Sequence, residues 1–247
     1  ILEGIAKYNT PDNPQDGRTG DLKRRIGEVY FLRGYLHLLL IRSYGEAVYV
    51  NRVINPGDDM TFEKESFHSM VEKICADADS AYNRVDSWNG GQYFGRVDKG
   101  ACLGLKAMAR WLAATPLWNG GNLPNDNRIF KSEYGYDQKR WELARDAAKA
   151  VLECTKEDGS LRYKLYETYT KDDFRDVDGK TDTNNKKVQQ RLWQMMYDMN
   201  AIQDEWVWFV TRDKDTGWSG DVLPPSQGGH ARQRPLQEQV DEYEYIA

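Results

Sequence analysis

The residue types in this chain that most often do chemistry are its histidines and cysteines. The histidines are far apart in the sequence and form no H-E-x-x-H zinc motif: His37, His68 and His230. The sequence has no G-x-S-x-G nucleophile turn and no G-x-x-x-x-G-K-S/T phosphate loop. The cysteines show no metal-ligand spacing, and the first two fall on apolar helical faces as small hydrophobes do: Cys75, Cys102 and Cys154. The pattern predicts no catalytic residue, no metal site and no cofactor.

Carboxylates are the other candidates for chemistry. The segment "DFRDVDGKTDTNN" invites comparison with a calcium loop, but it places Phe174 at the first ligand position and Asn185 where a bidentate glutamate is needed. A solvated polar loop is therefore expected there. Carboxylate pairs such as Asp213 and Asp215 could serve a glycosidase only at a defined separation, which the sequence does not give. Charged surface is the simpler interpretation.

Aromatic residues in loops point to ligand binding instead. In "TRDKDTGWSGD", Trp218 stands among small residues that leave its ring uncovered, and Arg212, Asp213 and Asp215 could hydrogen-bond to sugar hydroxyls around it. Sugar rings stack on aromatic faces, while their hydroxyls need polar partners. The alternative is that Trp218 packs back onto a strand expected at 205–211 or against a partner protein.

A second aromatic loop, "SWNGGQYFG", carries Trp88 and Tyr93 beside two adjacent glycines. These two rings are further candidates for glycan contact. The competing interpretation is structural, because the loop joins two helices that are expected to pack together.

Composition narrows the classes of partner. The chain has 247 residues, with 34 Lys and Arg against 39 Asp and Glu, and a net charge of −5. A surface for nucleic acid or for anionic lipid would be basic, so neither is expected. Eight Trp and fifteen Tyr are more rings than one core needs, which favours exposed aromatic surface. No signal peptide is visible, and both ends of the chain are interpreted as cuts through a longer protein.

Helical periodicity supplies the elements that would position these residues. Apolar stripes predict helices over about 21–44, 62–85, 98–114 and 138–154. The first contains "EVYFLRGYLHLLLIRSYG", whose charges exclude a membrane span and indicate a central helix with His37 hydrogen-bonded in the core. Arg33 and Arg42 are expected to keep their charged ends in water.

The spacing of these helices predicts stacked hairpins. The second and third start about 36 residues apart, close to the tetratricopeptide period of about 34 residues, and alanines on their stripes permit close packing. We expect the stripe of Phe67, Ile74 and Ala81 to face the following residues: Leu105, Met108 and Leu112. The predicted fold class is mainly α, tetratricopeptide-like, with long irregular loops and minor β. Residues 1–247 would form a single incomplete domain, with a repeat-like core at 21–155 and a loop-rich segment at 156–247.

Five segments in order resemble one family, the SusD/RagB nutrient-uptake lipoproteins of the Gram-negative outer membrane. "EVYFLRGYLHLLLIRSYGEAVYV" is similar to the family's central F-L-R-A-Y helix, and "GRVDKGACLGLKAMARWLAATPLWN" to its G-R-x-x-K-G-A-A helix. "VEKICADADSA", "EWVWFV" and "RPLQEQVDEYE" resemble its D-L-x-x-A helix, E-x-I-x-x-V strand and P-T-Q-E-L-V-D motif. The departures are small: Gly34 and Cys102 replace alanines, and Leu236 replaces a threonine.

The resemblance implies a SusD-like helical fold and a non-enzymatic, lipid-anchored protein at the cell surface. Such a protein captures glycans or peptides and passes them to a TonB-dependent, SusC-like outer-membrane transporter. The family's proteins are longer than this chain, so the lipidated cysteine would lie before Ile1. The matched motifs are structural, and no binding residue carries over from them.

Two functions remain open at this stage. One is glycan capture at the cell surface, and the other is a helical-repeat scaffold whose aromatics all serve the core or a partner. A glycoside hydrolase is a distant third. Aromatics in loops beside polar residues favour capture, whereas aromatics at helical spacing, such as Trp111 and Trp141, favour a scaffold.

Overall fold

The computed structural model describes residues 19–89, 93, 95–121, 123, 126–165 and 204–208. All of them lie in the first of two compact units, Ile1–Phe209 and Val210–Ala247. Within these described stretches, the structure is built from α-helices joined by loops, and its only β-structure is two isolated bridges, Ala47 with Glu65 and Thr155 with Leu161. This confirms the prediction of a mainly α chain.

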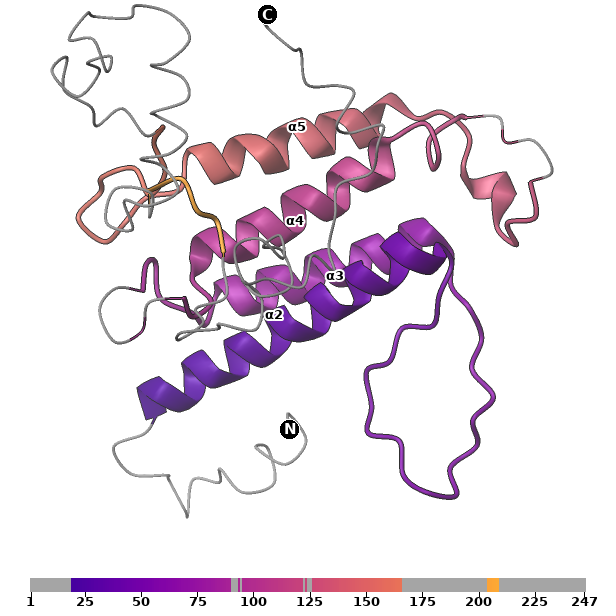
Figure 1. Cartoon of the computed structure of the whole chain (residues 1–247), viewed down its shortest axis with the longest axis horizontal. Coiled ribbons are helices and arrows are strands. Elements are labelled where there is room, and N and C mark those ends of the chain that lie inside the picture. Colours follow the sequence, from indigo (N-terminus) through magenta and orange to yellow (C-terminus); the bar gives the residue numbers. More distant parts are fainter. Residues whose placement is uncertain are drawn as a thin grey trace, which may run out of the picture. The chain divides into compact units, whose positions relative to one another are not determined.

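Four α-helices follow one another through the described part of the chain (Figure 1): α2 (Thr19–Tyr44), α3 (Phe67–Tyr82), α4 (Lys99–Ala114) and α5 (Gln138–Leu152). A short 3-10 helix, η2 (Lys131–Glu133), precedes α5. The predicted ranges are correct except that α3 is shorter at both ends. Its start is set by Ser66, which accepts a hydrogen bond from the Ser69 backbone N–H, while the preceding Glu65 pairs with Ala47.

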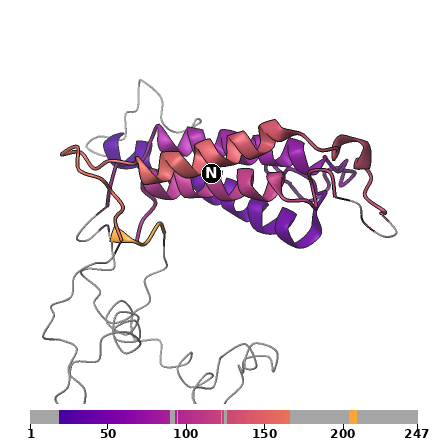
Figure 2. The same ribbon diagram turned by 90° about the horizontal axis from the view of Figure 1, so that it is seen from above.

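Consecutive helices pack side by side and run antiparallel (Figures 1 and 2). Between α3 and α4, this direction is visible in two ion pairs, Glu72 with Arg110 and Asp79 with Lys106. Between α2 and α3, Gly34 brings the backbones close, since a Cβ there would lie 3.2 Å from both Asp77 and Leu105. The α3–α4 hairpin is therefore confirmed.

The core lies where α3 meets α2 and α4. Phe67, Ile74 and Ala81 are all buried, as is Leu105 across from them. The placement of Met108 is wrong, because its side chain is 45% exposed. The buried stripe of α4 uses small residues instead, which let the helix approach its neighbours closely: Ala101, Cys102, Ala109 and Ala113.

Polar residues in α2 also differ from expectation. His37 is buried as predicted: its Nδ1 lies 2.8 Å from the Arg33 carbonyl and its Nε2 accepts from the Val50 N–H. Arg33, however, does not keep its charge in water. It donates twice to the buried carboxylate of Asp77 on α3, which also accepts from the Tyr49 hydroxyl. A buried carboxylate is unfavourable without an opposite charge, so Asp77 is stabilised by its pairing with Arg33.

The strand expected at 205–211 is not formed in its described part. Residues 204–208 make turns and bends, with no ladder beside them. Trp208 instead packs edge-on against Phe31 and Tyr35 of α2, with ring centroids 4.9 and 5.1 Å apart. Trp208 therefore holds this segment against α2. Residues 209–211 lie outside the described residues.

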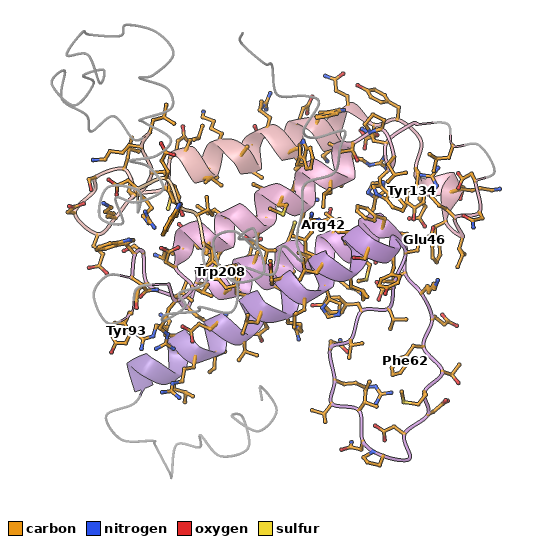
Figure 3. The ribbon with its side chains drawn as sticks, viewed as in Figure 1. Arg42, Glu46, Phe62, Tyr93, Tyr134 and Trp208 are labelled. Atoms are coloured by element: carbon orange, nitrogen blue, oxygen red, sulfur yellow. The ribbon has the colours of Figure 1, made fainter. Side chains whose placement is uncertain are left out.

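Glu46 fastens the far end of α2 to the loop before α5. Its buried carboxylate accepts from the backbone N–H groups of Ile129 and Phe130 and from the Tyr134 hydroxyl (Figure 3). Arg42, one helical turn earlier, is exposed as predicted. Across the described helices, none is long and apolar enough to cross a membrane.

Candidate ligand-binding site

Trp88 lies in the loop between α3 and α4, with 37% of its side chain exposed. The loop is held in place by its neighbour Asn89, whose buried side-chain amide donates to the Val97 carbonyl over 2.8 Å. The Lys156 ammonium lies 5.3 Å and the Arg162 guanidinium 6.0 Å from the centre of the indole ring. Trp88 is therefore an exposed ring flanked by cations that come from beyond α5.

Arg162 is positioned by a buried ion pair. Its Nε lies 3.5 Å from a carboxylate oxygen of Asp98, and both side chains are nearly inaccessible to solvent. Asp98 also accepts from the Ala101 N–H and so caps α4. Burial raises the pKa of Asp98, against the lowering effects of the Ala101 N–H and the Arg162 charge. The pair fixes the segment after α5 against the start of α4.

Tyr93 is the second predicted aromatic, and it is also 37% exposed. Arg24 stacks over its ring at 4.1 Å, and Arg96 lies 5.7 Å from the same centroid. Arg96 in turn donates to both carboxylate oxygens of Glu28 at 2.7 and 2.6 Å. Tyr93 thus has its own set of cations, and its ring helps to fasten the loop to α2 (Figure 3).

A polar pocket of about 540 Å³ opens where three helix ends meet. We call it the helix-end pocket. Its walls come from the end of α3, the start of α4 and the end of α5 with the turn that follows: Tyr82, Val85, Asp86, Ser87, Lys99, Leu103, Ala150, Glu153, Cys154, Thr155, Lys156 and Glu157. Lys156 belongs both to this wall and to the surroundings of Trp88, so the ring and the pocket are neighbours.

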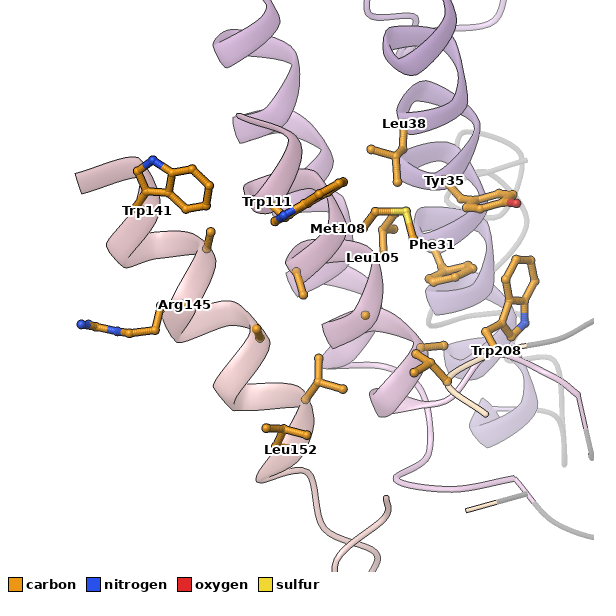
Figure 4. Close-up of a pocket in the computed structure, with 17 residues that line it drawn as sticks. Phe31, Tyr35, Leu38, Leu105, Met108, Trp111, Trp141, Arg145, Leu152 and Trp208 are labelled. Atoms are coloured by element: carbon orange, nitrogen blue, oxygen red, sulfur yellow. The ribbon is translucent and has the colours of Figure 1, made fainter. Parts of the chain in front are cut away.

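A second, apolar hollow of about 860 Å³ lies between α2, α4 and α5 (Figure 4). We call it the apolar groove. Large apolar areas are exposed along it at Met108, Trp111, Trp141 and Leu152. Arg145 is the one charged side chain among the described residues that line it. Trp208 closes one side. The groove offers surface for burial but few groups for hydrogen bonding.

All three cysteines are free and buried. For Cys75 and Cys102 this agrees with their interpretation as small hydrophobes on helical faces. Burial raises the pKa of Cys75 to about 11 and that of Cys102 further, so neither thiol ionises at neutral pH. Within the described ranges, no group of three His, Cys, Asp or Glu side chains could hold a metal ion.

The structure brings Trp88 and Tyr93 to the same loop but surrounds each with different cations. The other predicted glycan contacts, Arg212, Asp213, Asp215 and Trp218, lie outside the described residues, as does the acidic loop at 174–185. Sequence reasoning missed the pocket residues Ser87 and Lys99, and it missed the two cations beside Trp88, which are Lys156 and Arg162. The sequence around Trp88 gives no sign of Lys156 and Arg162, because both come from the segment after α5.

Comparison with known proteins places this geometry in a known fold. No family profile and no curated protein matches the chain. Among solved structures it is similar to BT4246, with a TM-score of 0.64 and 21% identity over 87% of this chain and 38% of that one. A selenomethionine form of BT4246 gives a TM-score of 0.60 and 22% identity, over 87% of this chain and 37% of that one.

A third similar structure is a SusD-like protein, BF3747 from Bacteroides fragilis NCTC 9343. Its TM-score is 0.47 and its identity 20%, over 70% of this chain and 26% of that one. The fold assignment rests on the two BT4246 structures, of which this chain spans only 38% and 37%. The mainly helical fold expected from the sequence is confirmed, and at these identities the likeness to BT4246 concerns the fold alone.

Proposed function

We propose that this chain is part of a cell-surface protein that captures glycans and passes them to a TonB-dependent, SusC-like transporter. The protein would be a lipoprotein of the outer membrane, held there by a lipid anchor. It would bind its glycan without cleaving it. The proposal follows from the resemblance of five sequence segments to the SusD/RagB family.

The observation that carries the proposal is Trp88, an exposed indole that stands beside a polar pocket on a SusD-like fold. An aromatic face next to hydrogen-bonding side chains suits a sugar, which has apolar ring faces and hydroxyl edges. Trp218 with Arg212, Asp213 and Asp215 is proposed separately as a glycan contact.

Calorimetry on the full-length protein with neutral oligosaccharides tests the proposal. One or two stacked rings with exposed hydrogen bonds predict weak binding, with Kd of about 1 mM to 1 μM. Absence of binding by every oligosaccharide in a panel of plant, microbial and host glycans would refute glycan capture.

The non-enzymatic part has its own test. Incubation of the protein with the same polysaccharides is expected to release no new reducing ends, because the sequence offers no catalytic constellation. Turnover that a single Asp or Glu substitution abolishes would contradict this expectation.

The apolar groove favours the alternative, a helical scaffold that binds another protein. Its exposed Trp111, Trp141 and Met108 follow helical spacing, and surface of this kind usually marks contact with protein. A Met108→Glu variant separates the two functions. Loss of transporter association with unchanged glycan affinity would assign the groove to protein contact. Loss of glycan affinity in the same variant would instead assign the apolar groove to the sugar site.

A further inference from the structure

Ser87 is the most unusual polar group in the wall of the helix-end pocket. Only 9% of the residue is exposed, and its Oγ contacts no hydrogen-bond partner among the residues that the structure describes. A buried hydroxyl without a partner is unfavourable, and proteins keep few of them. Because Ser87 lines the pocket, a molecule bound there can supply the missing hydrogen bond.

Lys99 lines the same pocket as Ser87, and its ammonium group forms no ion pair with the described residues. Its backbone N–H donates to the Asp86 carbonyl over 2.9 Å, which holds the start of α4 against the segment that carries Ser87. Its ammonium lies 5.2 Å over the ring of Tyr82, and the described part of the chain gives it no carboxylate partner. Lys99 and Ser87 therefore present two donors on one side of the pocket.

The opposite wall supplies acceptors. Glu153 and Glu157 come from the end of α5 and the turn after it, and Thr155 lies between them. Glu153 is only loosely paired with Lys149, at 3.4 Å, with both side chains mainly in water. The pocket thus has donors from the α3–α4 loop and the start of α4 on one side, and it has acceptors, together with Lys156, from the end of α5 and the following turn on the other.

The charges around the helix-end pocket nearly cancel. Asp86, Glu153 and Glu157 are acidic, and Lys99 and Lys156 are basic. Lys156 is already held 3.4 Å from Asp204. A phosphate or sulfate would meet the three carboxylates, and a cation would meet the two ammonium groups. A neutral molecule whose hydroxyls both donate and accept suits such a wall best.

We propose that the helix-end pocket binds one sugar unit of a neutral glycan, with Ser87 and Lys99 donating to its oxygens and Glu153 accepting from its hydroxyls. The chain of the glycan then continues over Trp88, which adjoins the pocket through Lys156. This inference rests on the proposed glycan capture and assigns it a place in the fold. A volume of about 540 Å³ lies in the usual range for ligand pockets.

The test uses the full-length protein and isothermal calorimetry with neutral gluco-, manno- and xylo-oligosaccharides as probes. Lys99→Met is expected to weaken binding of the best probe by about tenfold or more, because a hydrogen bond from a charged donor is lost. Ser87→Ala removes a neutral hydrogen bond and is expected to weaken it by about three- to tenfold. Glu153→Gln keeps the shape and is expected to have the smallest effect.

Two controls keep the result tied to the pocket. Lys139→Met removes an exposed lysine at the start of α5, far along the helix from Glu153, and is expected to leave affinity unchanged. The melting temperature of Ser87→Ala is expected not to fall, because the hydroxyl has no hydrogen-bond partner to lose among the described residues. A drop in melting temperature would show that Ser87 is a structural group and overturn its role in binding.

The outcomes separate this inference from the proposed function. If the wild-type protein binds an oligosaccharide and the Ser87 and Lys99 variants bind it equally well, the pocket assignment is wrong and glycan capture stands. If no oligosaccharide binds the wild-type protein, both fail. If oligomers of hexuronic acid bind more tightly than every neutral probe and depend on Lys99, the pocket is an anion site and the assignment to a neutral sugar is wrong.

Discussion

Helices α3 and α5 are nearly equal in length, 16 and 15 residues, yet they are built for different purposes. Eight residues of α3 are buried, whereas α5 buries only Ala144. α3 is covered by α2 on one side and by α4 on the other, while α5 packs mainly on α4 among the described helices. α3 therefore contributes mainly to stability, whereas α5 leaves most of its side chains available for binding.

The surface of α5 contributes to both the apolar groove and the helix-end pocket. Along its length it lines the apolar groove with Trp141 and Val151, and at its end it lines the helix-end pocket with Ala150 and Glu153. Apolar side chains that remain in water gain nothing until a partner covers them, whereas polar walls can stay hydrated until a ligand arrives. Substitutions in α3 and α5 should therefore have opposite profiles: large effects on stability in α3, and effects on binding in α5.

The largest expected effect is in the core. Ile74→Ala on α3 is expected to lower the free energy of unfolding by about 2–5 kcal/mol, because the side chain is fully buried, at 0% exposure, and its loss leaves a cavity. Val151→Ala, the matched change on α5, should cost less than about 1 kcal/mol because its site is only partly covered. Urea unfolding followed by circular dichroism measures both. Equal losses in the two variants would remove the contrast between the helices.

The next effect concerns charge within α3. Asp77→Ala leaves Arg33 and Tyr49 without their shared acceptor and is expected to cost about 3 kcal/mol. Asp79→Ala is the matched control, since Asp79 pairs with Lys106 at the surface and such pairs contribute about 0–1 kcal/mol. If the two variants unfold at the same urea concentration, the buried network does not hold α2 to α3.

A smaller effect is expected from pH. His68 on α3 lies 2.9 Å by its Nε2 from the Trp118 carbonyl, and burial lowers its pKa below the usual 6.5, helped by the charge of Arg140. The unfolded chain then binds a proton more readily than the folded one, so this contribution to stability is present above about pH 6.5 and is lost as pH falls. α5 contains no histidine.

Unfolding free energies at about pH 7.5 and about pH 5.5 test this expectation, since both lie outside the range where Asp and Glu usually titrate. The wild-type protein should lose stability on acidification, and His68→Gln should lose less. An identical loss in the variant would mean that His68 does not contribute to the pH dependence.

Sequence periodicity was sufficient for the helices because burial in this fold repeats at helical spacing. The stripe through Phe67, Ile74 and Ala81 is both the signal in the sequence and the core of the structure. Periodicity gave the wrong position for Met108, because two faces of α4 are apolar and the pattern does not say which of them α3 covers. It also failed at 205–211, where alternating large residues suggested a strand and a tryptophan anchor was found.

The candidate site was less accessible to sequence reasoning. Trp88 and Tyr93 were identified from loop composition alone, and the structure leaves both rings exposed. Arg96 is close to Tyr93 in the sequence, but the other cationic neighbours of the two rings, and the pairing of Asp98 with Arg162, depend on contacts between segments more than 60 residues apart. No local pattern encodes such contacts.

The last prediction concerns which loop binds the glycan, and it is expected to change stability least. Trp88 is partly exposed at the surface, so Trp88→Phe should leave the melting temperature nearly unchanged while it reduces the aromatic area available to a sugar ring. Trp218→Ala is the corresponding change in the second proposed loop and is expected to abolish binding at an unchanged melting temperature. Calorimetry on the two single variants compares the contributions of the two loops. Unchanged affinity in both single variants would move the sugar site away from both loops and leave the aromatic residues to the core and to protein contact.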